Sequence, residues 1–229
     1  MNLIIPVAAD KAEYEDKMPY LFNLSDDGIM LCIKAIMGLK LSNFSNIYFT
    51  ILNKHNELYL LEDLFKLQFK RIGIENKAHV VVLKDSTKNQ LETIAKTIEM
   101  KNIQDCFMIK DADSYFECDI NPENSVTIFP LDALSSVNPK DKSYVAVDDS
   151  YYITNIIEKK IISRFFCAGG YIFENVNSFL KLYNELKTEN KLFLSHIIYK
   201  DLLEGTVYRP ILVKNYKDWG TKEDWRKDN

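Results

Sequence analysis

The sequence predicts an α/β fold in which layers of helices cover a mixed, mostly parallel sheet. In the first half of the chain, short apolar runs alternate with segments of helical periodicity, and this βαβ alternation is typical of a parallel, right-handed sheet. In the second half, apolar runs outnumber helical segments, which indicates further strands. Because no linker rich in Pro, Gly or Ser interrupts the chain, we expect residues 1–229 to form one domain, a Rossmann-like three-layer sandwich.

The expected elements follow from these patterns. We expect strands at residues 2–8, 47–52, 79–83 and 106–110 in the first half, and at 126–130, 144–147, 151–157, 165–173 and 206–213 in the second. We expect helices at residues 29–39, 56–72, 90–100, 176–187 and about 192–203. The helix at 56–72 would bury an apolar stripe of Leu60, Leu61, Leu64, Phe65 and Phe69.

Composition excludes several kinds of site and partner. The formal net charge of −4 leaves no basic surface for nucleic acid. Three histidines and four cysteines are scattered without metal-binding spacing, which argues against zinc and against a disulfide framework. No apolar segment is long enough to span a membrane and the N-terminus has no signal-peptide pattern, so we expect a cytoplasmic protein with no membrane partner. Oligomeric state stays open, since no coiled-coil heptad is present.

Two aspartates follow a short apolar run and mark the first candidate site. The run at 106–109 is typical of a buried strand, and Asp111 and Asp113 fall at its carboxyl end, the edge at which open α/β sheets bind ligands. On an extended backbone the i, i+2 spacing places both carboxylates on one face, where a hard divalent cation could hold them and attract phosphates. The alternative is that one aspartate caps the next turn and the other is solvated.

Six segments together resemble the motifs of a known family, the sugar-phosphate nucleotidyltransferases. These enzymes have a GT-A-type fold and join a nucleoside triphosphate to a sugar phosphate, or to another small phosphate ester, with release of pyrophosphate. The resemblance covers nearly the whole chain and implies Mg²⁺ as the cofactor, a nucleoside triphosphate and a phosphorylated acceptor as the partners, and a role in surface polysaccharide synthesis. The segments are 1–9, 85–93, 111–113, 152–160, 167–173 and 217–225.

The resemblance also implies roles for individual residues. Asp113 and Asp218 would be the metal ligands and, with Lys17, the catalytic residues. Glu158, Lys159, Gly169 and Gly170 would bind the acceptor, although a solvated strand end and a plain bend are the structural alternatives. The nucleotide-binding residues would be Ala8, Ala9, Lys11, Gln90 and Asp111.

The segment after the first expected strand departs from that family. The family has Gly-x-Gly-x-Arg followed by Pro-Lys, whereas residues 9–20 of this chain contain neither glycine nor arginine and carry four acids. Lys11 and Lys17 are the basic residues there, and acids close to a triphosphate are repulsive. Two alternatives to the enzyme therefore stay open. One is a catalytically degenerate regulatory module that binds a nucleotide or sugar nucleotide, and the other is a GT-A glycosyltransferase.

Overall fold

The chain folds around one large mixed sheet. A computed structural model describes residues 1–9, 18–134, 141–189 and 191–228. The strands are β1 (Asn2–Pro6), β2 (Asn46–Leu52), β3 (Ala78–Leu83), β4 (Phe107–Lys110), β5 (Ser114–Glu117), β6 (Ser125–Pro130), β7 (Ser143–Val147), β8 (Ile153–Glu158), β9 (Phe165–Phe173), β10 (Arg209–Leu212) and β11 (Lys214–Asp218). The helices are α1 (Leu31–Lys34), α2 (Asn53–Tyr59), α3 (Leu61–Arg71), α4 (Gln90–Lys101), α5 (Val176–Leu186), α6 (Leu194–Leu203) and α7 (Lys222–Asp228).

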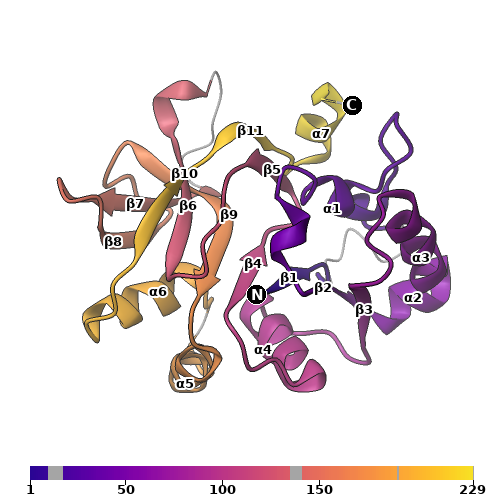
Figure 1. Cartoon of the computed structure of the whole chain (residues 1–229), viewed down its shortest axis with the longest axis horizontal. Coiled ribbons are helices and arrows are strands. Elements are labelled where there is room, and N and C mark those ends of the chain that lie inside the picture. Colours follow the sequence, from indigo (N-terminus) through magenta and orange to yellow (C-terminus); the bar gives the residue numbers. More distant parts are fainter. Residues whose placement is uncertain (10–17, 135–140, 190, 229) are drawn as a thin grey trace.

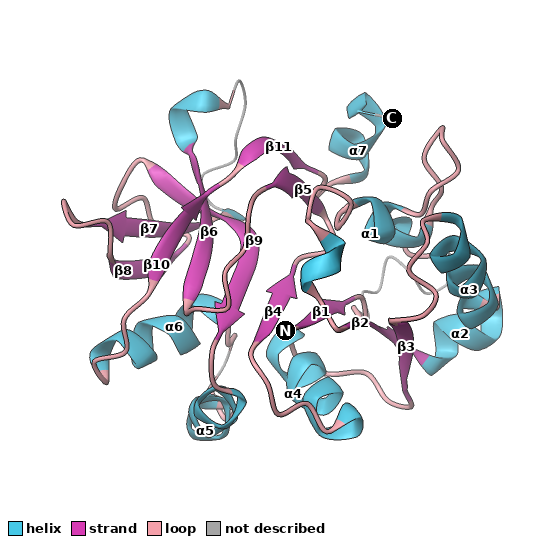
Figure 2. Ribbon diagram, viewed as in Figure 1, coloured by secondary structure: helices cyan, strands magenta, loops and turns pink. Residues whose placement is uncertain are grey.

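The predicted mixed, mostly parallel sheet is confirmed. Its main path has the order β10, β6, β9, β4, β1, β2, β3. The pairs of β1 with β2 and β4, of β2 with β3 and of β10 with β6 are parallel. Strand β9 alone on this path runs antiparallel to its neighbours β4 and β6, as far as the described chain shows. Strands β7 and β8 extend the sheet from β9, and β5 pairs with β11 in a separate ribbon (Figure 2).

Helices cover both faces of the sheet and produce the predicted three layers. Alternate side chains of β1 point to opposite faces. Leu3 and Ile5 join a buried cluster that includes Phe65 of α3, whereas Ile4 joins a second cluster that includes Ile94 of α4. Figure 1 shows α4, α5 and α6 together along one side of the molecule, with α1, α2 and α3 beside the β1–β3 half. Strands β1, β2 and β4 are therefore buried on both faces, which explains their continuous apolar sequences, whereas the edge strand β3 is partly exposed.

The helix expected at residues 29–39 is shorter than predicted. Only Leu31–Lys34 is α-helical, and turns follow it. Gly38 packs so closely on β5 that an added Cβ would lie 2.1 Å from the carbonyl oxygen of Phe116. The next residue, Leu39, forms a parallel β-bridge with Cys118. Tertiary contacts therefore override the helical periodicity of this segment.

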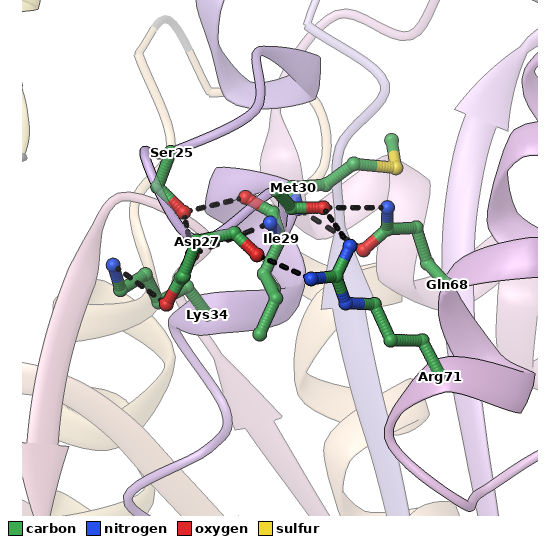
Figure 3. A network of polar contacts seen from close by, with 8 residues as sticks. Ser25, Asp27, Ile29, Met30, Lys34, Gln68 and Arg71 are labelled. Carbon is green, nitrogen blue, oxygen red and sulfur yellow. Dashed lines mark hydrogen bonds and ion pairs between the residues drawn. The ribbon is translucent and has the colours of Figure 1, made fainter.

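A tight turn at residues 25–28 directly precedes the segment that was expected to be helical. Gly28 lies in the turn with φ +70°, a conformation that favours glycine. Two side chains of α3 hold the turn: Gln68 Nε2 donates to the Gly28 carbonyl oxygen (3.0 Å) and Arg71 Nη2 donates to the Asp27 carbonyl oxygen (2.6 Å) (Figure 3). The Asp27 carboxylate pairs with Lys34 at 3.3 Å. This network joins α1 to α3 although the two lie far apart in the sequence.

The helix expected at residues 56–72 is two helices. They meet at Leu60, which has the left-handed φ of +51° and ends α2. Leu61 and Phe65 are buried as predicted, but Leu60 and Leu64 are 66% and 38% exposed. The prediction that these two leucines face the core is wrong, because the break rotates α3 relative to α2.

The remaining differences lie in short elements. The strands expected at 47–52, 79–83, 106–110, 126–130, 144–147 and 165–173 are found to within one residue at each end. The strand expected at 206–213 is limited to β10, and β5, β11 and α7 were not predicted. Among the described residues, no helix has the length and apolar character that crossing a membrane requires.

Candidate functional site

A cavity of about 450 Å³ opens at the carboxyl edge of the parallel strands. Its wall includes Ala8 and Ala9, which follow β1, and Asp111 and Asp113, which follow β4. Gln90, the first residue of α4, lines the same cavity. The structure thus brings together five residues that the sequence placed in a nucleotide or metal site, at the edge where α/β sheets bind ligands.

The start of α4 faces this cavity and is fixed by local hydrogen bonds. The side chain of Asn89 caps the helix by accepting from the N–H of Glu92 at 3.0 Å. Gln90 Nε2 donates to Asp111 Oδ1 at 2.7 Å, so the helix start is joined to the end of β4. The N-terminus of a helix carries partial positive charge, which suits the binding of an anion nearby.

Lys110 stabilises the aspartate turn, residues 111–114, and could not be selected from the sequence. The side chain is fully buried. Its Nζ donates to the carbonyl oxygens of Asp111 and Ser114 (both 2.7 Å) and to Ser114 Oγ (2.8 Å). Burial lowers the pKa of Lys110 to about 8, although the charges of Asp111 and Asp113 act in the opposite direction. Its one sequence signal is a lysine at the end of an apolar strand, which is equally typical of a solvated residue.

The environment of Asp111 disfavours its charge. Burial, followed by the negative charge of Asp113, raises the pKa of the Asp111 carboxyl to about 6. Lys110 and the hydrogen bond from Gln90 act in the opposite direction. We use the name acidic cluster for Asp111, Asp113 and Asp218. Such a shift at the edge of a cavity is typical of functional sites.

The β5–β11 ribbon brings Asp218 close to the other two aspartates of the acidic cluster. The pairing is antiparallel and places Asp218 opposite Ser114, the neighbour of Asp113. The N–H of Trp219 donates to the carbonyl oxygen of Asp113 at 2.8 Å. Trp219 itself is buried in a cluster with Leu31 of α1 and so anchors this end of β11. The ribbon therefore joins the two aspartates that the sequence could only relate by resemblance.

Lys142 is a second residue that the sequence did not select. It directly precedes β7, and its Nζ forms an ion pair with Asp218 Oδ2. The same atom donates to Tyr216 Oη at 3.0 Å and lies 5.7 Å from the centroids of the Phe166 and Tyr216 rings. Lys142 stands in no motif, so the sequence offers no pattern from which this contact could be predicted.

Gly169 and Gly170 lie in β9 behind the aspartate turn. Gly169 has φ +93°, and its carbonyl oxygen accepts from the N–H of Asp111 at 2.8 Å. A Cβ at this position would lie 2.7 Å from Ser114 Oγ and 2.9 Å from Asp111 Oδ2. Gly170 packs on Thr127, whose Oγ1 accepts from the glycine N–H at 2.8 Å. The backbone of Gly169 therefore packs closely against the turn at residues 111–114. Gly170 instead packs against Thr127 and Met108 inside the sheet.

Among the described residues, the predicted residues that do not line the cavity are Asp218, Glu158, Lys159, Gly169 and Gly170. The Glu158 carboxylate accepts from the hydroxyls of Ser143 and, at 3.0 Å, Ser195. Lys159 has φ +58°, and its Nζ lies 5.0 Å from the centroid of the Phe193 ring. Both side chains are therefore engaged between β8, β7 and the start of α6. Lys11 and Lys17 lie outside the described residues.

The acidic cluster fits a magnesium ion that is shared with phosphate. Mg²⁺ prefers oxygen ligands and is usually bound by one or two carboxylates together with water and substrate phosphates. Asp113 and Asp218 are half-buried; Asp218 pairs with Ser114 in the ribbon, and Asp113 directly precedes Ser114, so two carboxylates are available at this end of the ribbon. In the described part of the chain, no group of three or more His, Cys, Asp or Glu residues could hold a metal ion. With two carboxylates, the other ligand positions of a Mg²⁺ ion would have to be filled by water and phosphate oxygens.

Comparisons with known proteins agree on the fold. No protein-family model matches the chain, and a search of curated protein sequences finds no match. Among solved structures, a nucleoside-diphosphate-sugar pyrophosphorylase from Vibrio cholerae RC9 matches 99% of this chain and 98% of its own, with a TM-score of 0.77 at 14% identity. An inositol-1-phosphate CTP transferase from T. maritima matches 97% of this chain and 90% of its own, with a TM-score of 0.72 at 15% identity.

The structure of a UDP-glucose pyrophosphorylase in complex with UDP-glucose also matches the fold of this chain. It matches 99% of this chain and 96% of its own, with a TM-score of 0.72 at 14% identity. Each of these three proteins is matched along almost its full length, so no large element of the fold is missing here. The chain therefore has the fold of the sugar nucleotidyltransferases.

Proposed function

We propose that this protein is a Mg²⁺-dependent nucleotidyltransferase. It would condense a nucleoside triphosphate with a sugar phosphate or another small phosphate ester, release pyrophosphate and supply an activated precursor for surface polysaccharide. The observation that carries the proposal is that Asp113, which lines the cavity, directly precedes the residue with which Asp218 pairs in the β5–β11 ribbon. The fold shared with a pyrophosphorylase and a CTP transferase supports it.

The proposed reaction needs positioning and charge neutralisation more than covalent chemistry from the protein. A phosphate oxygen of the acceptor attacks the α-phosphorus of the triphosphate, one P–O bond forms, and the bond to the bridging oxygen of the leaving pyrophosphate breaks. Mg²⁺ held by Asp113 and Asp218 would neutralise the phosphate oxygens. The N-terminus of α4 would add its partial positive charge at the same edge of the sheet.

Gln90 is the residue that we propose to contact the base. One N–H of its amide is held by Asp111 Oδ1 at 2.7 Å. This bond fixes the plane of the amide and leaves its other N–H and its oxygen for a ligand. An amide held in this way can recognise a donor and an acceptor on the edge of a nucleobase. Ala8 and Ala9, at the end of β1, would let the ligand approach the backbone closely.

A second function is favoured by the sequence of residues 9–20. The four acids of this segment, with neither glycine nor arginine, favour a module that binds a nucleotide or sugar nucleotide without turnover. In that case the acidic cluster and Gln90 would bind the ligand, and regulation of a partner enzyme would be the output. The two functions share one site and differ in whether pyrophosphate is released.

The test is a pyrophosphate-release assay with CTP, UTP, GTP, ATP and dTTP, each with Mg²⁺ and a panel of sugar 1-phosphates and choline phosphate. The proposal predicts release with one nucleotide and one acceptor class. No release with any pair at high protein concentration would contradict it. Tight nucleotide binding in calorimetry without release would favour the regulatory module, and transfer from a nucleotide sugar would favour a glycosyltransferase.

A further inference from the structure

Lys142 directs a positive charge toward the acidic cluster. Its Nζ forms an ion pair with Asp218 and donates to Tyr216 Oη at 3.0 Å, while only 14% of the side chain is exposed. The charge also reaches Asp111, whose ionised form it favours. The centroids of the Phe166 and Tyr216 rings each lie 5.7 Å from Lys142 Nζ. These rings limit where the ammonium group can move.

Two described lysines close to the cluster in the fold, Lys110 and Lys159, have different partners. Lys110 uses its three N–H groups on Asp111 and Ser114, so it has none for a ligand. Lys159 extends over Phe193. Lys142 and Lys159 face each other across the β7–β8 pair, where the N–H of Lys159 donates to the Lys142 carbonyl oxygen at 2.9 Å. Of these two neighbours, it is Lys142 whose side chain enters the acidic cluster.

A divalent cation that binds at Asp218 would displace the Lys142 ammonium from that carboxylate. The cation and the ammonium compete for the Asp218 carboxylate, because each gains most of its binding energy from the same negative charge. An ammonium displaced within a few ångströms of that cation is repelled unless an anion lies between them. A phosphate bound to the cation is such an anion, and lysine binds phosphate as a point charge.

We propose that Lys142 is the phosphate-binding lysine of this site, held on Asp218 in the free protein and released to a phosphate oxygen when a divalent cation takes that carboxylate. This inference rests on the proposed function and gives a phosphate contact to Lys142, whereas the resemblance implied that Lys159 binds the acceptor. Lys142, which directly precedes β7, adds a positive charge to a protein whose residues 9–20 carry four acids and two lysines.

The substitution Lys142→Gln tests both parts of the inference, because they change in opposite directions. Binding of Mn²⁺ alone, measured by the electron paramagnetic resonance of the free ion, should become about three- to tenfold tighter since the competitor is gone. Binding of inorganic phosphate to the Mg²⁺-saturated protein, measured by calorimetry, should become about tenfold weaker. Lys142→Arg keeps the charge and should retain phosphate binding.

Two further variants separate this role from a general loss of charge. Lys160→Gln removes an exposed lysine next to Lys159 and should change neither measurement. Lys159→Gln should also change neither. Loss of phosphate binding in Lys159→Gln but not in Lys142→Gln would overturn the inference.

The remaining outcomes distinguish this inference from the proposed function. If Lys142→Gln weakens both Mn²⁺ and phosphate binding with an unchanged circular dichroism spectrum, its role is structural and the inference is wrong. If the wild-type protein binds Mn²⁺ and phosphate and Lys142→Gln binds them equally well, only the inference fails. If the wild-type protein binds no Mn²⁺, the metal site of the proposed function fails and the inference fails with it.

Discussion

The neighbouring residues Lys110 and Asp111 both carry charges that burial disfavours. The pKa of Lys110 falls to about 8 and that of Asp111 rises to about 6, with burial as the first cause of each shift. A carboxyl whose pKa is higher in the folded state binds protons more tightly there than in the unfolded chain. Its contribution to the free energy of unfolding is therefore present below the unfolded value of 3.8 and is lost as the pH rises through 6.

Asp111→Asn should remove this pH dependence. The amide can still accept from Gln90 but carries no charge to desolvate, so the free energy of unfolding of the variant should exceed that of the wild type by about 1–2 kcal/mol at pH 7.5. At pH 3 the two should be nearly equal, because the wild-type carboxyl is then mostly protonated in both the folded and the unfolded state. Urea denaturation at both pH values measures the difference. A variant that is equally destabilised at both pH values would contradict the assigned environment of Asp111.

Individual site residues could be predicted where a spacing or a motif identified them. Asp111 and Asp113 could be selected because they follow a strand, and Gln90 because its segment resembles a family motif; the structure places all three on one cavity. Lys110 and Lys142 could not be selected, because their roles depend on burial and on contacts made by other segments. Lys159 shows the converse, since a matching motif did not determine where its side chain points.

The β5–β11 ribbon and β9 are the elements that position the acidic cluster. The ribbon sets Asp218 beside Asp113, and β9 supports the turn through Gly169. Neither β5 nor β11 was predicted. Each is short, and the pairing partner of each lies about one hundred residues away, so no local pattern encodes the pairing. By contrast, α4 has a side-chain cap and a continuous buried face, both of which are visible in the sequence.

Gly169→Ala should disturb the aspartate turn without opening the sheet. The added Cβ would lie under 3.0 Å from Ser114 Oγ and Asp111 Oδ2, at a φ that non-glycine residues rarely adopt. We expect a loss of about 2–4 kcal/mol in the free energy of unfolding, from strain together with overpacking. Chemical denaturation measures the loss.

Gly73→Ala is the matched control for that prediction. Gly73 also has a positive φ, of +71°, but nothing lies within 4 Å of an added Cβ. It should therefore lose only the strain part, about 1 kcal/mol. Equal losses in the two variants would show that contact with Ser114 and Asp111 does not matter.

The whole molecule keeps a nucleotidyltransferase fold with little of the corresponding sequence. The solved structures described above match nearly the entire chain at 14% and 15% identity. The fold could be predicted because buried strands and amphipathic helices recur in a βαβ order, and such patterns survive substitution. The break at Leu60 and the short α1 could not be predicted, because a left-handed residue and contacts from α3 and β5 decide them.

The central claim for the whole molecule is that residues from distant parts of the chain, Asp113 and Asp218, share one divalent cation. The most direct measurement is Mg²⁺-dependent nucleotide binding by calorimetry in a double-mutant cycle of Asp113→Asn and Asp218→Asn. If the two share one ion, each single variant loses binding and the double variant loses little more, which gives a coupling free energy of about 1–3 kcal/mol. Effects that simply add, or a single variant that binds as the wild type does, would contradict the shared site.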